Sequence, residues 1–326
     1  MALSNARGLP ERSFSKWKKT IISPSAGVRK DSDYRDCRAN RETGELIGDN
    51  SGMTQNIKDL HVYLRSIRPD ERTSLSVLSG LVHDGATVLD LGCGSGALGT
   101  YLRETRNCTV DGLTWSEAEA ELARRAYRQV VVADLDAANL LELFTAQQYD
   151  YIICADVLEH LRGPDNVLRQ CRDLLKPTGQ LLFSVPNAGY AGLVAELMQG
   201  DFRYREEGLL DSTHLRFFTR KSLARFLGDN AWEIQAMDTI RREMPESEFK
   251  AQFDELPPAV SRYLLSPRDA LTYQFIGSAT PVAQPLSNEV VANAGEPPAD
   301  AHALFTTQLY VDRGDGYTED GKLSAT

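Results

Sequence analysis

Long apolar runs, paired cysteines and a signal-peptide core are all missing from this sequence of 326 residues. No stretch approaches the roughly 18 uninterrupted apolar residues that a membrane-spanning helix requires, and the N-terminus has no apolar core of the kind that directs secretion. The five cysteines are odd in number, scattered and never spaced C-x-x-C, which argues against a disulfide framework and a structural zinc site. These absences predict a soluble cytoplasmic protein with reduced thiols and no metal.

Charge is distributed unevenly along the chain. The formal net charge is −10, yet residues 1–43 carry ten Lys/Arg against five Asp/Glu, which leaves −15 on the remainder. The acidic body should repel nucleic acid. The basic lead segment has two interpretations, a solvated flexible arm or a peripheral contact with an anionic membrane surface or polymer.

Composition and hydropathy divide the chain into a central domain and its extensions. Hydrophobic residues at 42% and charged residues at 25% suit a globular protein, and the length suits one large domain with appendages. We predict a flexible basic arm over 1–50, two N-terminal helices over 51–82 with the second opening at Pro69-Asp70, an α/β domain over 83–281, a Pro/Ala/Asn-rich linker over 282–303, and a β-hairpin extension or the start of an incomplete β module over 304–326.

From residue 83 onward, short β-rich runs alternate with helical patterns. This alternation is typical of βαβ units, which build a mostly parallel sheet covered by helices on both faces. Ser116 and Thr219 precede two of the helical patterns and are predicted to cap those helices. The predicted strands span 86–91, 109–114, 129–134, 149–155, 179–185, 232–240 and 271–278. The predicted fold class is therefore α/β, three-layered and doubly wound.

A glycine-rich turn follows the first predicted strand, in Asp90-Leu-Gly-Cys-Gly-Ser-Gly96. Doubly wound sheets bind ligands at this place, where glycines let the backbone bend sharply and approach a ligand closely. The glycine spacing also satisfies the dinucleotide pattern G-x-G-x-x-G/A, so the glycines alone leave a nicotinamide enzyme open. Asp90 discriminates between the two, because a carboxylate near the turn repels a pyrophosphate and attracts a cationic ligand.

The segment Asp-x-Gly-x-Gly-x-Gly that begins at Asp90 resembles the first motif of class I methyltransferases, whose cofactor S-adenosylmethionine carries a sulfonium and an ammonium group. Seven predicted strands, the last of them antiparallel, resemble the Rossmann-like sheet of the same family. Further matches follow at Asp134 and in Tyr151-Ile-Ile-Cys-Ala-Asp-Val-Leu-Glu-His-Leu161. The resemblance covers residues 83–240 and implies transfer of a methyl group from S-adenosylmethionine.

This resemblance also implies cofactor contacts. The acidic residue that binds the ribose in the family falls on Thr114, which departs from the pattern and leaves Asp111 or Glu117 as a replacement. Trp115 either stacks on the adenine or packs in the core, and Asp134 either meets the adenine amino group or caps a turn. The residues predicted to bind the cofactor are Asp90, Gly92, Cys93, Gly94, Gly96, Thr114, Trp115, Asp134, Leu135 and Asp156.

Two histidines are expected at the cofactor end of the sheet, where a base would deprotonate an acceptor hydroxyl. His160 follows the fourth strand, and His214 lies near Asp211 in the insertion Gly208-Leu-Leu-Asp-Ser-Thr-His-Leu-Arg-Phe-Phe-Thr219. Each histidine also has an interpretation as a structural hydrogen-bonding residue. We predict His160, His214 and Asp211 as the catalytic residues.

The acceptor leaves several interpretations open. The insertion and the preceding Val185-Pro-Asn187 resemble methyltransferase domains found beside bacterial glycosyltransferases, which implies a sugar or glycan hydroxyl in polysaccharide synthesis and a glycosyltransferase partner. A quinone, polyketide or other small molecule suits Leu158-Glu-His160 as well. A non-catalytic domain that positions a glycosyltransferase is a third interpretation. Tyr190, Leu193, Leu197 and Met198 either line an acceptor pocket or pack a helix on the sheet.

Overall fold

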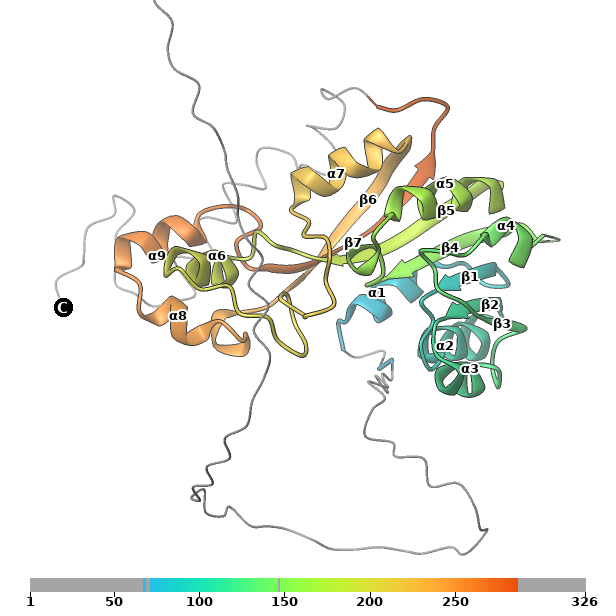
Figure 1. Ribbon diagram of the computed structural model, residues 1–326, viewed down its shortest axis with the longest axis horizontal. Coiled ribbons are helices and arrows are strands. Elements are labelled where there is room, and N and C mark those ends of the chain that lie inside the picture. Colours follow the sequence, from blue (N-terminus) through green and yellow to red (C-terminus); the bar gives the residue numbers. More distant parts are fainter. Residues whose placement is uncertain (1–66, 69–70, 146, 287–326) are drawn as a thin grey trace, which may run out of the picture. The chain divides into compact units, whose positions relative to one another are not determined.

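The computed structural model describes residues 67–68, 71–145 and 147–286, and in this part the predicted strands form one seven-stranded sheet (Figure 1). Its strand order is β3-β2-β1-β4-β5-β7-β6. The strands are β1 (Thr87–Leu91), β2 (Thr109–Thr114), β3 (Gln129–Val132), β4 (Tyr149–Ala155), β5 (Leu175–Pro186), β6 (Trp232–Arg241) and β7 (Thr272–Pro281). All seven predicted strands are confirmed, as is the antiparallel last strand, because β7 pairs antiparallel with both β5 and β6.

The sheet has its ligand-binding edge where the strand order reverses. Strand β1 pairs in parallel with β2 on one side and with β4 on the other, so the connections that leave β1 and β4 diverge at their carboxyl ends. Open α/β sheets bind ligands in the crevice at such a point. The glycine-rich turn after β1 and the segment after β4 therefore share one edge of the sheet.

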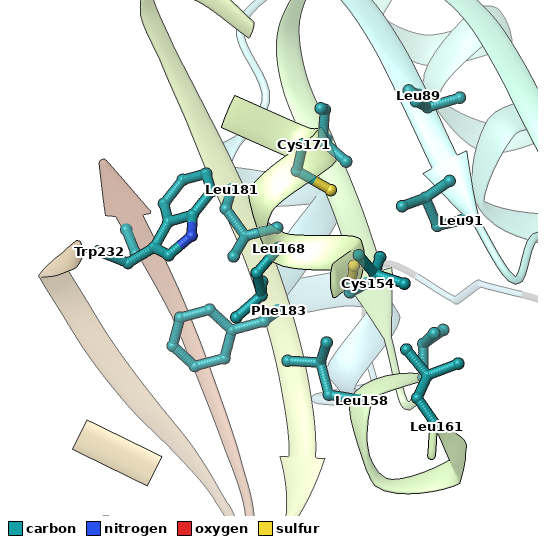
Figure 2. Packing of buried hydrophobic residues seen from close by; sticks show 14 of the residues in the cluster. Leu89, Leu91, Cys154, Leu158, Leu161, Leu168, Cys171, Leu181, Phe183 and Trp232 are labelled. Atoms are coloured by element: carbon teal, nitrogen blue, oxygen red, sulfur yellow. The ribbon is translucent and has the colours of Figure 1, made fainter. Parts of the chain in front are cut away.

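Both faces of the sheet are covered by helices, as predicted. Leu89 and Leu91 of β1 lie in one buried cluster with residues of α5 (Pro164–Leu174), whereas Val88 lies in the cluster on the opposite face with α1 (Ser74–Leu81) and α2 (Ala97–Arg106). Figure 2 shows Leu168 and Cys171 of α5 packed over the strands. Burial on both faces explains why neighbouring residues of β1, such as Val88 and Leu89, are both apolar.

Helix caps agree with the sequence at two positions. The Ser116 hydroxyl accepts a hydrogen bond from the Glu119 backbone N–H and begins α3 (Glu117–Ala123). Thr219 and Ser222 form a reciprocal capping box at the start of α7 (Arg220–Asp229). The other helices of the described residues are α4 (Leu140–Leu143), η2 (Leu158–His160), α6 (Ala191–Met198), η3 (Met244–Glu246), α8 (Lys250–Asp254) and α9 (Pro258–Leu265).

The second N-terminal helix begins later than predicted. Instead of opening at Pro69-Asp70, α1 begins at Ser74 after residues 71–73, which are not helical. Thr73 and Ser76 form a capping box there, with each side chain accepting a hydrogen bond from the backbone of the other. Two satisfied backbone donors favour this start over a proline that supplies none.

The segment between β6 and β7 folds into η3, α8 and α9. In Figure 1, α8 and α9 group with α6, which lies between β5 and β6 in the sequence, beyond the antiparallel end of the sheet. Tyr190, Leu193, Phe249 and Tyr273 are buried together in this cluster. The Tyr190 hydroxyl donates to the Arg242 backbone carbonyl at 3.0 Å. The cluster fixes one end of the segment that carries His214.

Several predictions fall outside the described residues. These are the basic arm over 1–50, most of the two-helix segment over 51–82 before α1, the linker beyond residue 286, and the β extension over 304–326. Among the residues that the structure does describe, none of the helices is both long enough and apolar enough to cross a membrane.

Candidate active site

The glycine-rich turn between β1 and α2 has a backbone that only glycine adopts readily. Gly92, Gly94 and Gly96 have φ values of +75°, +52° and +87°, a region that costs L-residues with a side chain about 1 kcal/mol or more. A Cβ atom on Gly92 would lie 2.6 Å from Cγ2 of Val157, which follows β4. The turn is thus held directly against the segment that leads to His160.

Asp90 is buried at the end of β1, with 3% of its surface exposed. Its carboxylate accepts a hydrogen bond of 2.6 Å from the Tyr127 hydroxyl, which itself accepts from the Gly99 backbone N–H at 2.9 Å. Burial raises the pKa of Asp90 to about 7, although the Tyr127 hydrogen bond opposes this shift. A cation bound beside the carboxylate would offset the cost of holding its negative charge in this place.

Glu119 is the residue that the sequence interpretation missed. Its Oε2 accepts a buried hydrogen bond of 2.7 Å from the hydroxyl of Thr114, at the end of β2. Its Oε1 lies 3.9 Å from the point that a Cβ of Gly94 would occupy. The spacing Ser-x-x-Glu at a predicted helix start was the available signal, since it places the glutamate in the first turn of α3, beside its own cap.

The two replacements considered for the ribose ligand lie in other environments. Asp111 is completely buried and accepts hydrogen bonds from Arg128 and, at 2.7 Å, from the Tyr149 hydroxyl. Those partners use both of its oxygens in a charged network inside the protein. Glu117 is exposed and pairs with Arg124 on the outer face of α3. Of these three acidic residues, Glu119 contacts the end of β2.

The other predicted cofactor residues occupy different environments. Trp115 is 82% exposed, so the core-packing interpretation is wrong. Asp134 accepts a hydrogen bond from the Asp136 backbone N–H at 3.0 Å, which agrees with the turn-capping interpretation. The side chain of Leu135 lies in the hydrophobic core and leaves only its backbone to face a ligand. Burial, followed by Asp90 and Glu119, raises the pKa of the Cys93 thiol, which is therefore no nucleophile.

Asp156 stands at the carboxyl end of β4 in a strained conformation. Its φ of +55° is unusual for a residue with a side chain. Its Oδ1 accepts hydrogen bonds from the Ser184 hydroxyl at 2.7 Å and from the Gln274 amide at 2.9 Å. These bonds connect β4, β5 and β7, and strain of this kind persists where neighbouring contacts hold a residue in place.

The rings of His160 and His214 lie together, although the two residues are far apart in the sequence. Thr213, the residue before His214, is 53 positions from His160. Their ring centroids are 4.7 Å apart in an edge-to-face arrangement. The backbone carbonyl of Glu159 accepts hydrogen bonds from the Leu215 and Arg216 backbone N–H groups at 2.8 and 2.9 Å. These two bonds fix the insertion against η2 and hold the histidine pair in register.

A chain of side-chain hydrogen bonds connects Asp211 and His160, two of the three residues predicted to be catalytic. The Thr213 hydroxyl donates to Oδ1 of Asp211 at 2.6 Å and lies 3.0 Å from Nδ1 of His160. Because a hydroxyl has one proton and a carboxylate only accepts, the Nδ1 of His160 must carry the proton of that second bond. The Nδ1 of His214 lies 3.1 Å from the Leu209 carbonyl, so it too must be the donor. Both Nε2 atoms are left with a lone pair in the neutral rings.

The electrostatics of this group favour a neutral His160 ring and an ionised Asp211 carboxylate. Burial, and then the neighbouring His214, lower the pKa of His160, whereas Asp211 acts in the opposite direction. Burial alone would raise the pKa of Asp211, but hydrogen bonds from Thr213 outweigh it and bring that pKa below its usual value. Asp211 is therefore an anion, and in this form it orients the hydrogen bonds through Thr213 to His160.

The proposed pocket lining is wrong for two of its four residues. Tyr190 and Leu193 are buried in the helical cluster with Phe249, because their face of α6 packs on α8 and α9. Leu197 and Met198 are 48% and 56% exposed. Beside His214, the rings of Phe217, Phe202 and Tyr204 form a continuous series of edge-to-face contacts, each ring between 38% and 54% exposed.

Some curated proteins are similar to part of this chain. Ubiquinone biosynthesis O-methyltransferases from Pseudomonas syringae and Pseudomonas entomophila are 35% and 34% identical over 127 residues, which cover 36% of this chain and 48% of theirs. The chain thus spans about half the length of the curated relatives it matches.

Solved structures with a similar arrangement include two methyltransferases. An O-methyltransferase of a polyketide synthase multienzyme from Brevibacillus brevis matches with a TM-score of 0.43 and 16% identity, over 72% of this chain and 81% of that one. Magnesium protoporphyrin IX methyltransferase from Synechocystis matches with a TM-score of 0.43 and 19% identity, over 63% of this chain and 80% of that one.

The family comparison covers more of the sequence than the matches to curated relatives do. The family described as a methyltransferase domain matches residues 54–236, which include the glycine-rich turn, Glu119, and both histidines of the pair. Because this match spans more than half of the 326 residues, the chain belongs to the methyltransferase domain family.

Proposed function

We propose that this methyltransferase transfers the methyl group of S-adenosylmethionine to a hydroxyl oxygen of a small acceptor. The observation that carries the proposal is the meeting of two features at one sheet edge. The glycine-rich turn beside buried Asp90 touches Val157, and three residues further on His160 meets His214. A cation-binding turn and a pair of unprotonated nitrogens are the two requirements of methyl transfer to oxygen.

S-adenosylmethionine is the cofactor of this domain and supplies an electrophilic methyl group on sulfur. The glycine-rich turn lets the cofactor lie close to the protein backbone, and the Asp90 carboxylate attracts the positive charge of the cofactor. Thr114 and Glu119 together provide the acceptor oxygens for the ribose hydroxyls. Trp115, which is exposed beside them, offers a ring face for the adenine, with Asp134 and Asp156 further along the same edge.

The histidine pair assists loss of the acceptor's hydroxyl proton in this proposal. Both Nδ1 atoms are occupied by fixed hydrogen bonds, so both Nε2 lone pairs are available to the acceptor side. Asp211 acts through Thr213 and keeps His160 in the required tautomer, which is the part an orienting carboxylate plays beside a histidine base.

A sugar or glycan intermediate is the acceptor that we favour. The series of exposed rings at Phe217, Phe202 and Tyr204 begins next to His214. The electron-rich faces of such rings suit the C–H surface of a sugar, whose hydroxyls then point to the histidine pair. In this proposal the protein works in the cytoplasm beside a glycosyltransferase of polysaccharide biosynthesis.

A ring hydroxyl of a quinone precursor is the second candidate. Its support is the 35% identity to ubiquinone biosynthesis O-methyltransferases, although that match covers 48% of their length. The same exposed rings would stack on an aromatic acceptor. Polyketides and other small molecules with a hydroxyl belong to the same group of acceptors, and a non-catalytic domain is the outcome if no acceptor is methylated.

Calorimetry and mass spectrometry test the proposed function. Titration of the full-length protein with S-adenosylmethionine should give one binding site per chain. Glycans and quinones extracted from cells with and without the protein should then differ by one methyl group in one of the two pools, which identifies the acceptor class. Absence of cofactor binding at millimolar concentration would contradict both enzymatic candidates and leave the non-catalytic one.

Glu119→Gln should weaken S-adenosylmethionine binding by about ten-fold to 100-fold, because a charge-assisted hydrogen bond to the ribose contributes roughly 1.5–3 kcal/mol. The amide keeps the shape of the side chain and its contact with Thr114. Isothermal titration of both proteins measures the effect. Glu117→Gln, on the exposed face of the same helix, is the matched control and should leave the affinity unchanged. Equal affinities for Glu119→Gln and the wild type would remove Glu119 from the cofactor site.

A further inference from the structure

We propose that Glu159, His160 and His214 bind one first-row divalent cation, such as Zn²⁺, at the acceptor end of the site. A carboxylate oxygen and one nitrogen from each imidazole lie within 4.8 Å of one another. Binding of the cation depends on the positions, charge and donor atoms of these three residues. Only the use of the cation in catalysis rests on the proposed function.

The hydrogen bonds described above prepare both histidines as ligands. Metals bind the unprotonated nitrogen of a neutral imidazole, and the other nitrogen commonly donates to a carbonyl or carboxylate that orients the ring. Here Nδ1 of His214 donates to the Leu209 carbonyl, and Nδ1 of His160 donates to Thr213, whose hydroxyl donates to Asp211. The two Nε2 atoms are therefore the ligand atoms, already oriented before a cation arrives.

Glu159 supplies the negative charge from a position that cannot move freely. Its side chain is 1% exposed, and its backbone carbonyl accepts two hydrogen bonds from the insertion that carries His214. The three ligands thus come from η2 and from one segment hydrogen-bonded to it. A buried carboxylate is costly to hold as an anion, and a divalent cation is a strong compensating charge at such a place.

The donor set indicates which cations fit. Two imidazoles and one carboxylate suit Zn²⁺, Fe²⁺ and similar transition metals, whereas Mg²⁺ prefers an environment of oxygen ligands and retained waters. Three protein ligands also leave at least one position of a tetrahedral ion open, as in zinc sites where a substrate or water binds. The acceptor's hydroxyl oxygen would take that position.

A cation there would specify how the histidine pair assists the reaction. Coordination lowers the pKa of a hydroxyl, so the O–H bond breaks and its proton passes to water. The resulting oxygen anion attacks the methyl group, a C–O bond forms, the C–S bond breaks, and S-adenosylhomocysteine leaves with the sulfur electron pair. The cation is unchanged by the reaction. Asp90 takes no part in this step, because in the proposal it faces the cofactor and not the acceptor.

Cobalt substitution tests the site on the intact wild-type chain. The protein is treated with a chelator, dialysed and titrated with Co²⁺ and with Zn²⁺. We expect one ion per chain, a visible Co²⁺ absorption of low-coordinate intensity, and two exchangeable proton resonances shifted strongly by the paramagnetic ion, one for each hydrogen-bonded Nδ1–H. The proposal is overturned if no Co²⁺ binds, if more than one ion binds per chain, or if the number of shifted exchangeable proton resonances is other than two.

Variants assign the ligands. Glu159→Gln and His214→Gln should each weaken Zn²⁺ binding by at least about ten-fold, and Thr213→Val by roughly ten-fold through loss of ring orientation. The matched control replaces the three other histidines together, as His61→Gln, His83→Gln and His302→Gln, and should keep the wild-type affinity. If the control loses the ion and the two ligand variants keep it, the ion sits elsewhere and the proposal is wrong.

Cofactor titration, together with methyl-transfer assays in the presence of a chelator, separates the metal site from the proposed function. Methyl transfer that continues in the presence of the chelator would overturn the cation's catalytic part and leave the histidines as direct bases. One tightly bound ion in a protein that binds no S-adenosylmethionine would uphold the metal site while the proposed function fails. Turnover that is lost on chelation and restored by Zn²⁺ supports both.

Discussion

Asp90→Asn should weaken the affinity for S-adenosylmethionine by about 100-fold. The same substitution should make the unliganded protein more stable at neutral pH. The loss is expected because the amide has no charge to attract the sulfonium and ammonium groups. The stabilisation is expected because Asp90 is 3% exposed and burial raises its pKa to about 7. A residue that destabilises the empty protein and binds the cofactor is typical of functional sites.

The sign of the pH dependence follows from the raised pKa. The unfolded chain ionises Asp90 near pH 3.8, whereas the folded protein holds the proton until pH about 7. Over that interval the folded state binds more protons, so stability falls as pH rises. The variant lacks this loss, and the stability gap between Asp90→Asn and the wild type should widen by roughly 2 kcal/mol between pH 5 and pH 7.

Urea denaturation at these two pH values measures the gap. Cofactor affinity of the wild type should rise on the order of ten-fold between pH 5.5 and 7.5, because the cation binds the ionised form. Tyr127→Phe removes the hydrogen bond that lowers the pKa of Asp90, so the midpoint of this binding profile should move to higher pH. A flat profile in the wild type would show that Asp90 does not meet the cofactor's charge.

Glu196→Gln should destabilise the protein by about 3 kcal/mol, because breaking a buried ion pair leaves its partner uncompensated. The Glu196 side chain is completely buried and pairs with Arg205, whose own side chain is 17% exposed. Glu196 also accepts a hydrogen bond from the Arg203 backbone N–H at 3.0 Å. Glutamine keeps the volume but removes the charge that both bonds depend on.

This substitution should also slow methyl transfer without weakening cofactor binding. The Arg205 backbone bonds to Leu210 at 2.8 Å and to Ser212 at 2.9 Å, which anchors the turn that carries Asp211 and His214. We expect about ten-fold lower kcat with unchanged affinity for S-adenosylmethionine. Asp165→Asn, in the exposed pair with Arg169, is the matched control and should change stability by less than about 0.5 kcal/mol. Equal losses in both variants would contradict the anchoring argument.

The sequence alone determined the parts of the protein that depend on local patterns. Runs of strand-forming residues between helical patterns indicated all seven strands, because the alternation of such runs with helical patterns is typical of βαβ units. Ser116 and Thr219 were identifiable as caps, since a cap bonds to the backbone three residues away. The aspartate and glycines of the turn at 90–96 indicated the cofactor because this signal is also local: the turn and the charged residue lie within seven residues of sequence.

Only the tertiary structure decided which distant side chains meet. Alternation along β2 and the pairing with Arg128 turn Asp111 away from the cofactor, and a helix turn brings Glu119 to Thr114 instead. His160 and His214 were candidates in the sequence, but their contact and the position of Glu159 close to both depend on backbone bonds from the insertion to η2. Such contacts are set by how elements pack across the sheet, which spacing along the chain does not encode.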